Sequence, residues 1–283
     1  LLNRSSDLAE VADAVRDWLL TVDASSARPG DVVTVSFRPP GVPLMVAALT
    51  IAPSATGIAL PVDHEGDLVA SSSAAILDEI LPSVHALVIG PGLGAAESVR
   101  QLTVRLAGRE AIPMVIDADA LNALSRTADL QRDLRAPAVL TPHPGEYRRL
   151  ASSLGISLDP VEADQRPRAA EALAQRLGCI VVLKGAGTVV SDGHRTWTAA
   201  TGNAALATGG SGDVLSGVIG SMIAQFARGS TPLTLFDCAC LGVHIHGLAA
   251  DHWAAAHGAA GMLALELAES IPGALAALRA DRA

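Results

Sequence analysis

The stretch "GNAALATGGSGDVLSG", residues 202–217, places five glycines around a single charged side chain, Asp213, and runs on into an apolar segment. Glycine amides that precede a helix form a concave, positively polarised site for anions, and the helix dipole reinforces it. A carboxylate beside a bound phosphate can accept a proton from a hydroxyl that takes part in phosphoryl transfer. We therefore interpret the stretch as a phosphate loop with Asp213 as its base. The alternative is a helix-capping Asp after a flexible turn.

Upstream of this loop, short apolar runs alternate with longer helical patterns. Several of the runs are continuously apolar, which is typical of strands buried on both faces of a parallel sheet. The predicted strands are residues 31–37, 86–90, 113–119, 138–143, 179–185 and 188–193. The predicted helices are residues 74–81, 96–106, 120–126, 145–154, 160–177, 214–226, 234–256 and 263–279. This alternation predicts an α/β fold, a three-layer αβα sandwich with a mostly parallel central sheet.

The length of 283 residues suits one large α/β domain, and no repeat, linker or change of composition divides the chain. We expect a single domain over residues 1–283. Because the sequence begins with Leu1, we also expect a trimmed or incomplete N-terminus. The start lacks the basic and apolar regions of a secretion signal, and no apolar stretch reaches the roughly 18 uninterrupted residues of a membrane span. Secretion and membrane insertion are therefore not indicated.

Charge and cysteine content narrow the functional classes further. The formal net charge is −9, which argues against nucleic-acid binding through a broad basic face. Three cysteines, Cys179, Cys238 and Cys240, cannot all pair with one another, and none lies in a CxxC motif. Free thiols in a reducing compartment, the cytoplasm, are the expected state.

Unusual residues follow four of the predicted strands. Ligands in open α/β sheets bind beyond the carboxyl ends of the strands, so these segments are expected to converge on one site. The segments are residues 91–94, 117–119, 141–146 and 184–188.

Lys184 is the only lysine of the chain. In "LKGAGT" it ends a predicted buried strand and opens a second glycine-containing turn, which suits contacts with the phosphates or ribose of a nucleotide. The alternative is a strand-end lysine that buries its stem and keeps its ammonium group in solvent.

Two more of these segments carry polar side chains of interest. In "TPHPGE", residues 141–146, two prolines stiffen a loop that presents His143 and Glu146. A ligand contact and a structural role are equally open for His143, and Glu146 can instead lie in the first turn of the next helix, where the dipole favours an acid. In "DADALNAL", residues 117–124, we place Asp117 in the site and Asp119 at the helix cap.

Two further patterns are weaker. The "GPGLGA" of residues 90–95 fits the GxGxxA dinucleotide fingerprint, with Asp117 at a plausible spacing for a ribose contact, but Pro91 removes one backbone donor. A Rossmann dehydrogenase is therefore the weakest interpretation, and the absence of GxxxxGK[ST] excludes a Walker P-loop. His244 and His246 are two residues apart on a predicted helix and point in different directions, so we expect them to be structural or interfacial and not a metal pair.

The motifs "GPGLG", "DADALNAL", "TPHPGE", "VLKGAGTVV", "GNAALATGGSGDVLSG" and "VHIHGLAAD" follow one another in this order. Together they resemble the ADP-dependent NAD(P)H-hydrate dehydratases, which have the ribokinase-like fold. The resemblance runs from about residue 31 to the C-terminus, and "ATGGSGDVLSG" with "TPHPGE" is its most specific part.

The resemblance implies an enzyme that repairs the S epimer of hydrated NADH or NADPH. Such enzymes phosphorylate the ring hydroxyl with ADP, or with ATP in eukaryotic relatives, and then eliminate phosphate to restore the dihydronicotinamide. Magnesium on the nucleotide phosphates and a homotetramer are also implied. A phosphate is a better leaving group than hydroxide, so a phosphate loop beside a carboxylate suits this chemistry.

Carried over to this chain, the resemblance implies roles for individual residues. Asp213 would be the base that activates the hydroxyl. The implied nucleotide-binding residues are Lys184, Gly185, Ala186, Gly187, Thr188, Gly210 and Gly212. The implied substrate-binding residues are Gly92, Gly94, Asp117, His143, Glu146 and Asp213 itself.

The segment of residues 1–30 departs from the family pattern and is divergent or truncated. Asn3 and Arg4 stand where the family has a Gly-Gly-Ser turn, and the next predicted helix carries Glu10, Asp13 and Arg16 in place of mainly small residues. Two alternatives to a dehydratase therefore stay open: a small-molecule kinase that stops after phosphorylation, and a non-catalytic nucleotide-binding homologue.

Overall fold

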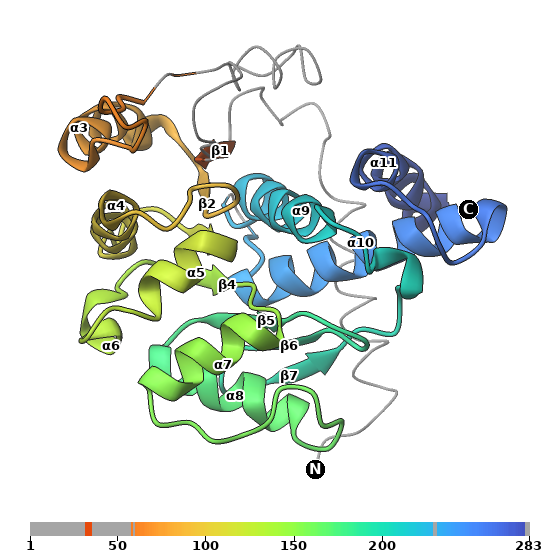
Figure 1. The fold of residues 1–283 in the computed structure, drawn as a ribbon. Coiled ribbons are helices and arrows are strands. Elements are labelled where there is room, and N and C mark those ends of the chain that lie inside the picture. Colours follow the sequence, from red (N-terminus) through yellow and green to blue (C-terminus); the bar gives the residue numbers. More distant parts are fainter. Residues whose placement is uncertain (1–31, 36–57, 59, 229–230, 281–283) are drawn as a thin grey trace.

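The computed structural model describes residues 32–35, 58, 60–228 and 231–280. A seven-stranded sheet forms its centre, with the strands in sequence order from β1 to β7 (Figure 1). The strands are β1 (Val32–Val35), β2 (Ala86–Ile89), β3 (Met114–Ile116), β4 (Ala138–Leu140), β5 (Ile180–Leu183), β6 (Val189–Ser191) and β7 (Thr196–Thr198). The predictions made for residues 1–30 lie outside the described residues.

The sheet is mostly parallel, as predicted. Strands β1 to β5 pair in parallel, whereas β6 and β7 pair antiparallel. Strand β7 was not predicted, because its Thr-Trp-Thr sequence is not a continuous apolar run. Trp197 is half-buried between the exposed Thr196 and Thr198, which is the alternation of an edge strand with one face in solvent.

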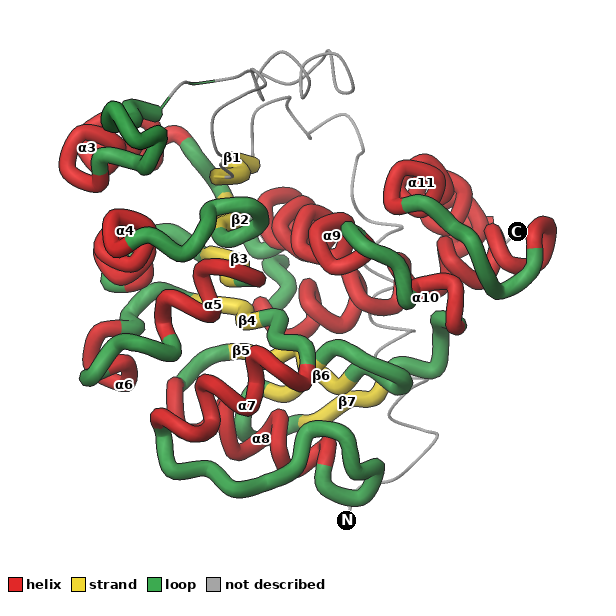
Figure 2. Tube along the Cα trace, in the orientation of Figure 1, coloured by secondary structure: helices red, strands yellow, loops and turns green. Residues whose placement is uncertain are grey.

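Helices cover both faces of the sheet, which confirms the predicted three layers (Figures 1 and 2). One face carries α3 (Ala70–Ile80), α4 (Glu97–Ala107), α5 (Ala118–Leu124), α6 (Leu130–Asp133), α7 (Pro144–Ser153) and α8 (Arg166–Leu177). The other carries α9 (Ser211–Phe226), α10 (Leu235–His257) and α11 (Ala264–Ala280). The described residues also form two short 3-10 helices, η2 (Leu81–Ser83) and η3 (Ala204–Leu206).

Alternate residues of the central strands feed two separate cores. Leu87 and Ile89 of β2 pack into the core under α3 to α8, whereas Val88 packs into the core under α9 to α11. Successive strand side chains point to opposite faces, so a strand covered on both sides must be apolar throughout. This is the physical reason for the continuous apolar runs in the sequence.

Local hydrogen bonds shift some element boundaries from their predicted positions. The helix predicted from residue 160 begins at Arg166. The Asp159 carboxylate accepts hydrogen bonds from the amides of Val161 and Glu162, at 2.6 and 3.3 Å, and holds that segment in a turn. The helix predicted from residue 120 begins at Ala118, because Asp117 and not Asp119 caps it.

All three cysteines are buried free thiols, as expected. Within the described part of the chain, no helix is long and apolar enough to cross a membrane.

Candidate active site

The loops that follow β2, β3, β4 and β5 meet at one edge of the sheet, beside the start of α9. Four neighbouring parallel strands present their carboxyl ends there, as the strand order requires. Gly90 allows the closest approach: a Cβ at this position would lie 1.7 Å from the carbonyl oxygen of Asp117, and its φ is +131°. Glycine is therefore required where the loop after β2 crosses the end of β3.

A buried ionic network lies at this edge. The Asp117 carboxylate is 1% exposed and accepts a bond from the Lys184 ammonium at 2.6 Å. Its other oxygen accepts the hydroxyl of Ser216 at 2.6 Å, and its first oxygen also caps the amide of Ala118 at 2.8 Å. A second carboxylate oxygen, from Glu146, lies 3.9 Å from the Lys184 nitrogen. The sole lysine is thus held by a charge-assisted bond to Asp117 at the end of β3 and by the nearby charge of Glu146 at the start of α7.

The start of α9 lies directly over this lysine. Gly210 precedes the helix with a φ of +88°, and Ser211 and Gly212 open its first turn. A Cβ at Gly212 would lie 3.3 Å from the Lys184 nitrogen and 4.0 Å from an oxygen of Asp117. Among the described residues, the amides of Gly212 and Asp213 have no backbone acceptor, whereas the Ser211 amide donates to the Thr208 carbonyl at 3.4 Å. These two amides and the lysine charge therefore act on the same region, which is suited to an anion.

Asp213 lies in that first turn and is exposed. Among the described residues, none donates a hydrogen bond to its carboxylate. Partial burial and the neighbouring charge of Asp117 raise the pKa of Asp213, and the Lys184 ammonium opposes the shift. A free carboxylate with a raised pKa, in the same helical turn as an anion site, is equipped to take a proton from a bound hydroxyl.

His143 and Glu146 form a capping box at the start of α7. The His143 amide donates to Glu146 at 2.8 Å, and the Gly145 amide donates to the His143 ring nitrogen Nδ1 at 2.9 Å. The first-turn alternative for Glu146 is confirmed, and this carboxyl is also buried beside Lys184. Burial raises the pKa of Glu146 to about 7. His143 is exposed, and desolvation together with the charges of Lys184 and Arg149 lowers its pKa.

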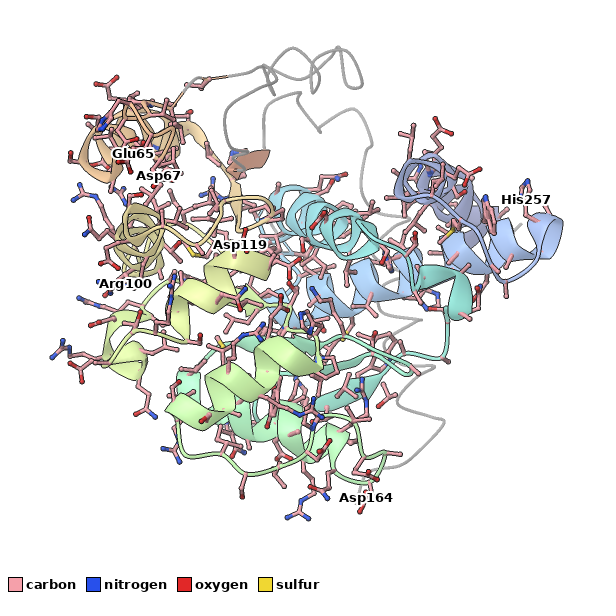
Figure 3. All side chains as sticks on the ribbon, in the orientation of Figure 1. Glu65, Asp67, Arg100, Asp119, Asp164 and His257 are labelled. Atoms are coloured by element: carbon pink, nitrogen blue, oxygen red, sulfur yellow. The ribbon has the colours of Figure 1, made fainter. Side chains whose placement is uncertain are left out.

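Asp119 ties the glycine loop after β2 to α5. Its carboxylate accepts the Gly94 amide at 2.7 Å, and Figure 3 labels it at the start of α5, beside that loop. The prediction that Asp119 caps the helix is wrong, since Asp117 is at the cap and Asp119 is in the first turn. Gly92 and Gly94 are exposed and have positive φ angles of 68° and 84°.

The loop from Lys184 to Thr188 continues the same edge. Gly185, Ala186 and Gly187 are exposed, and the Thr188 hydroxyl donates to the Gly185 carbonyl at 3.1 Å. Their amides are available to a ligand beside the buried end of Lys184.

Desolvation lowers the pKa of both His244 and His246 on α10. His246 is buried, its Nε2 lies 2.9 Å from the Ser211 carbonyl oxygen, and desolvation lowers its pKa to about 4. It supports the first turn of α9 as a neutral side chain, which agrees with the structural interpretation. Across the described ranges, no three His, Cys, Asp or Glu side chains gather in a way that could hold a metal ion.

Ser216 is the member of this network that sequence reasoning missed. It is a fully buried hydroxyl on the apolar face of α9, one turn beyond Gly212, and it joins the helix to the end of β3. A polar residue between apolar positions of a core-facing helix was the available signal.

The amino-acid sequence of this chain is similar to those of known NAD(P)H-hydrate dehydratases. A family profile described as NAD(P)H-hydrate dehydratase matches residues 46–273. The chain is 44% identical over 192 residues to the bifunctional NAD(P)H-hydrate repair enzyme Nnr of Escherichia coli (strain K12), a match that covers 68% of this chain and 34% of that protein. It is 42% identical over 190 residues to the ADP-dependent (S)-NAD(P)H-hydrate dehydratase of Neisseria meningitidis serogroup B, covering 65% of this chain and 61% of that one. The chain spans 34% to 40% of the length of the bifunctional relatives.

Solved structures give the same answer for the fold. The crystal structure of an ADP/ATP-dependent NAD(P)H-hydrate dehydratase from Bacillus subtilis, co-crystallised with ATP and Mg²⁺, matches with a TM-score of 0.63 and 27% identity, over 94% of this chain and 97% of that one. A ribokinase-like superfamily protein from Enterococcus faecalis matches in fold, with a TM-score of 0.67, 20% identity and coverage of 87% and 76%. The Rossmann interpretation of residues 90–95 is therefore wrong. This chain belongs to the NAD(P)H-hydrate dehydratase family and has a ribokinase-like fold.

Proposed function

We propose that this protein dehydrates the S epimer of NADH or NADPH hydrate with ADP as the phosphoryl donor. The observation that carries the proposal is the placement of Asp213 in the first turn of α9, above the Lys184–Asp117 pair. It puts a free base, a cation and unpaired amides at one sheet edge. Family membership and the printed activity of the Neisseria relative support the same reaction.

In the first step, Asp213 accepts the proton of the ring hydroxyl as the hydroxyl oxygen attacks the terminal phosphorus of ADP. A new oxygen–phosphorus bond forms, the bond from phosphorus to the bridging oxygen breaks, and AMP leaves with the electron pair. In the second step, the carbon–oxygen bond breaks and phosphate departs with its electron pair. The neighbouring ring carbon gives up a proton to solvent, and the electron pair of that carbon–hydrogen bond forms the ring double bond.

The nucleotide side of the site is assigned to the loop after β5 and the start of α9. We propose that Lys184, Gly210 and Gly212 act on the transferred phosphoryl group, where a cation and helix amides stabilise developing charge. The loop residues Gly185, Ala186, Gly187 and Thr188 contact the rest of the nucleotide.

A magnesium ion is proposed to arrive on the nucleotide phosphates. The described part of the chain holds no cluster of three or more His, Cys, Asp or Glu side chains that could bind the ion. Magnesium is commonly held by one or two carboxylates together with substrate phosphates and water. No step above depends on a protein-bound metal.

The hydrated cofactor is assigned to the other side of Asp213. We propose that Gly92, Gly94 and His143 contact it directly, and that the buried Asp117 and Glu146 act behind them through Lys184. The exposed backbone of the glycine loop and the exposed His143 ring support this division.

The test incubates the protein with NADPH hydrate, ADP and magnesium, and follows the near-ultraviolet absorbance of the restored dihydronicotinamide. Recovery of that absorbance with release of AMP and phosphate is expected. A stable phosphorylated hydrate would identify a kinase that stops after transfer, and nucleotide binding without turnover would identify a non-catalytic homologue. Either result would overturn the proposal.

A cytoplasmic location and a homotetrameric assembly are proposed from the family resemblance. Light scattering on the purified protein tests the assembly, with the mass of four chains as the expected result and that of one chain as the contradiction.

A further inference from the structure

Arg166 is a buried cation that has no acidic partner in the described part of the chain. The side chain is 7% exposed, and among the described residues no carboxylate lies within salt-bridge distance of it. Burial lowers the pKa of the guanidinium, and no neighbouring charge opposes that shift. Isolated buried charges are expensive, and proteins keep them where hydrogen bonds and a specific purpose compensate.

Three backbone carbonyls take the place of the missing acid. One terminal nitrogen of Arg166 donates to Pro160 at 2.6 Å, and the other donates to Leu183 at 3.2 Å and to Gly187 at 3.3 Å. Leu183 is the last residue of β5, and Gly187 lies in the loop that follows. The planar guanidinium therefore clamps both ends of the segment that contains Lys184, Gly185 and Ala186.

Gly185 shows how closely the loop rests on this clamp. A Cβ at Gly185 would lie 3.0 Å from one terminal nitrogen of Arg166 and 3.1 Å from the other, and its φ is +147°. The loop thus lies against the guanidinium, with its carbonyls of Leu183 and Gly187 turned inward. Because these two carbonyls point toward Arg166, their negative dipole ends do not face a ligand on the outer side of the loop.

We propose that Arg166 is a positioning residue that shapes the 184–188 loop for the phosphates of an adenine nucleotide. It holds the loop carbonyls away from the ligand and places an uncompensated positive charge behind the loop. Both effects favour an anion on the outer surface. This inference rests on the proposed function, because it assigns the nucleotide to this loop.

The experiment measures ADP affinity by calorimetry for the wild type and for Arg166→Met, Arg166→Lys and Arg168→Met. Arg168 lies on the same helix, is exposed, and is the matched control for the loss of one charge. We expect Arg166→Met to weaken ADP binding about tenfold or more, since it removes three charge-assisted bonds. Arg166→Lys should recover part of the affinity, and Arg168→Met should bind as the wild type does.

Two further measurements separate positioning from a general loss of structure. Affinity for NADPH hydrate should stay unchanged in Arg166→Met, and amide hydrogen exchange in residues 184–188 should accelerate while the body of α8 stays protected. Arg166→Lys keeps the charge and supplies the same readouts if the methionine variant does not fold.

Unchanged ADP affinity in both Arg166 variants, or an equal loss in Arg168→Met, would overturn the inference. If the wild type binds ADP but does not dehydrate the hydrate, the proposed function fails while the role of Arg166 can still be read from binding and exchange.

Discussion

Asp117 and Asp213 lie at the same edge of the sheet and act on the same lysine, yet their surroundings are opposite. Asp117 is buried at the end of β3 and accepts bonds from Lys184, Ser216 and the Ala118 amide. Asp213 is exposed in the first turn of α9, and none of the described residues bonds to it. A carboxylate whose lone pairs are occupied organises a site, whereas one with free lone pairs can take up a proton. The difference supports the proposal that Asp117 organises the site and that Asp213 carries out the chemistry.

The largest effect is expected from Asp213→Asn. The amide cannot accept the hydroxyl proton, so turnover should fall by about 10²- to 10⁴-fold. The free energy of unfolding and the affinity for ADP should stay close to those of the wild type, because Asp213 supports no described contact. Initial rates of absorbance recovery and calorimetry with ADP measure the two effects.

The matched control is Asp164→Asn, another exposed acid, which Figure 3 labels far from the start of α9. It should lose no activity. Normal turnover in the Asp213 variant would remove this residue from the role of base.

Asp117→Asn tests whether the buried carboxylate of Asp117 organises the site. Removing one partner from a buried ion pair leaves Lys184 uncompensated, and the free energy of unfolding should fall by about 3 kcal/mol. Urea denaturation measures the loss. The double variant Asp117→Asn with Lys184→Met should be more stable than the single variant, because the unpaired charge is gone. A single variant as stable as the wild type would show that the pair does not organise this edge.

Glu146 gives the buried network a pH dependence. Its pKa is raised from 4.5 to about 7, so the folded protein holds more protons than the unfolded chain between these values. The free energy of unfolding should therefore fall as the pH rises through this window, by at most about 1.4 kcal/mol per pH unit from this group. Urea denaturation across the window should show the fall in the wild type relative to Glu146→Gln. Parallel curves for the two proteins would contradict it.

The smallest effect is expected from Ser216→Ala. It removes the hydroxyl that Asp117 accepts and should cost about 1 to 3 kcal/mol of unfolding free energy, with the lower end expected because Lys184 still pairs with the same carboxylate. Ser221→Ala is the control on the same helix, since the Ser221 hydroxyl contacts only the exposed Gln225 in the described structure. Equal losses in both variants would mean that the bond to Asp117 adds no stability.

Much of the fold could be read from the chain because its signals are local. Strands buried on both faces must be continuously apolar, and Val88 shows why, since it faces a different core from its neighbours Leu87 and Ile89. The expectation that four strand ends converge followed from parallel pairing, and the structure confirms it. The edge strand β7 was not predicted because its sequence, Thr-Trp-Thr, lacks the continuous apolar run of the buried strands.

The site was only partly predictable, because sequence signals are local and most contacts of the site join distant segments. The glycines around Asp213, the single lysine and the acid of "TPHPGE" stood out by residue type alone. The cap at Asp117 was misassigned to Asp119, because either acid can begin a helix and only the carboxylate that reaches the Ala118 amide shows which one does. The buried hydroxyl of Ser216 and the buried charge of Arg166 have no local sequence signature of their function.

By itself, the sequence determined the layers, the parallel sheet and the glycine-rich start of α9 that is proposed to bind phosphate, because hydrophobic periodicity and glycine amides act over a few residues. Only the tertiary structure decided which carboxylate holds Lys184 and which stays free. Asp117 is 67 residues from Lys184 and 99 from Ser216 along the chain, and the order of the strands brings them together. Contacts of that separation depend on how the whole sheet assembles, so they could not be foreseen from any one segment.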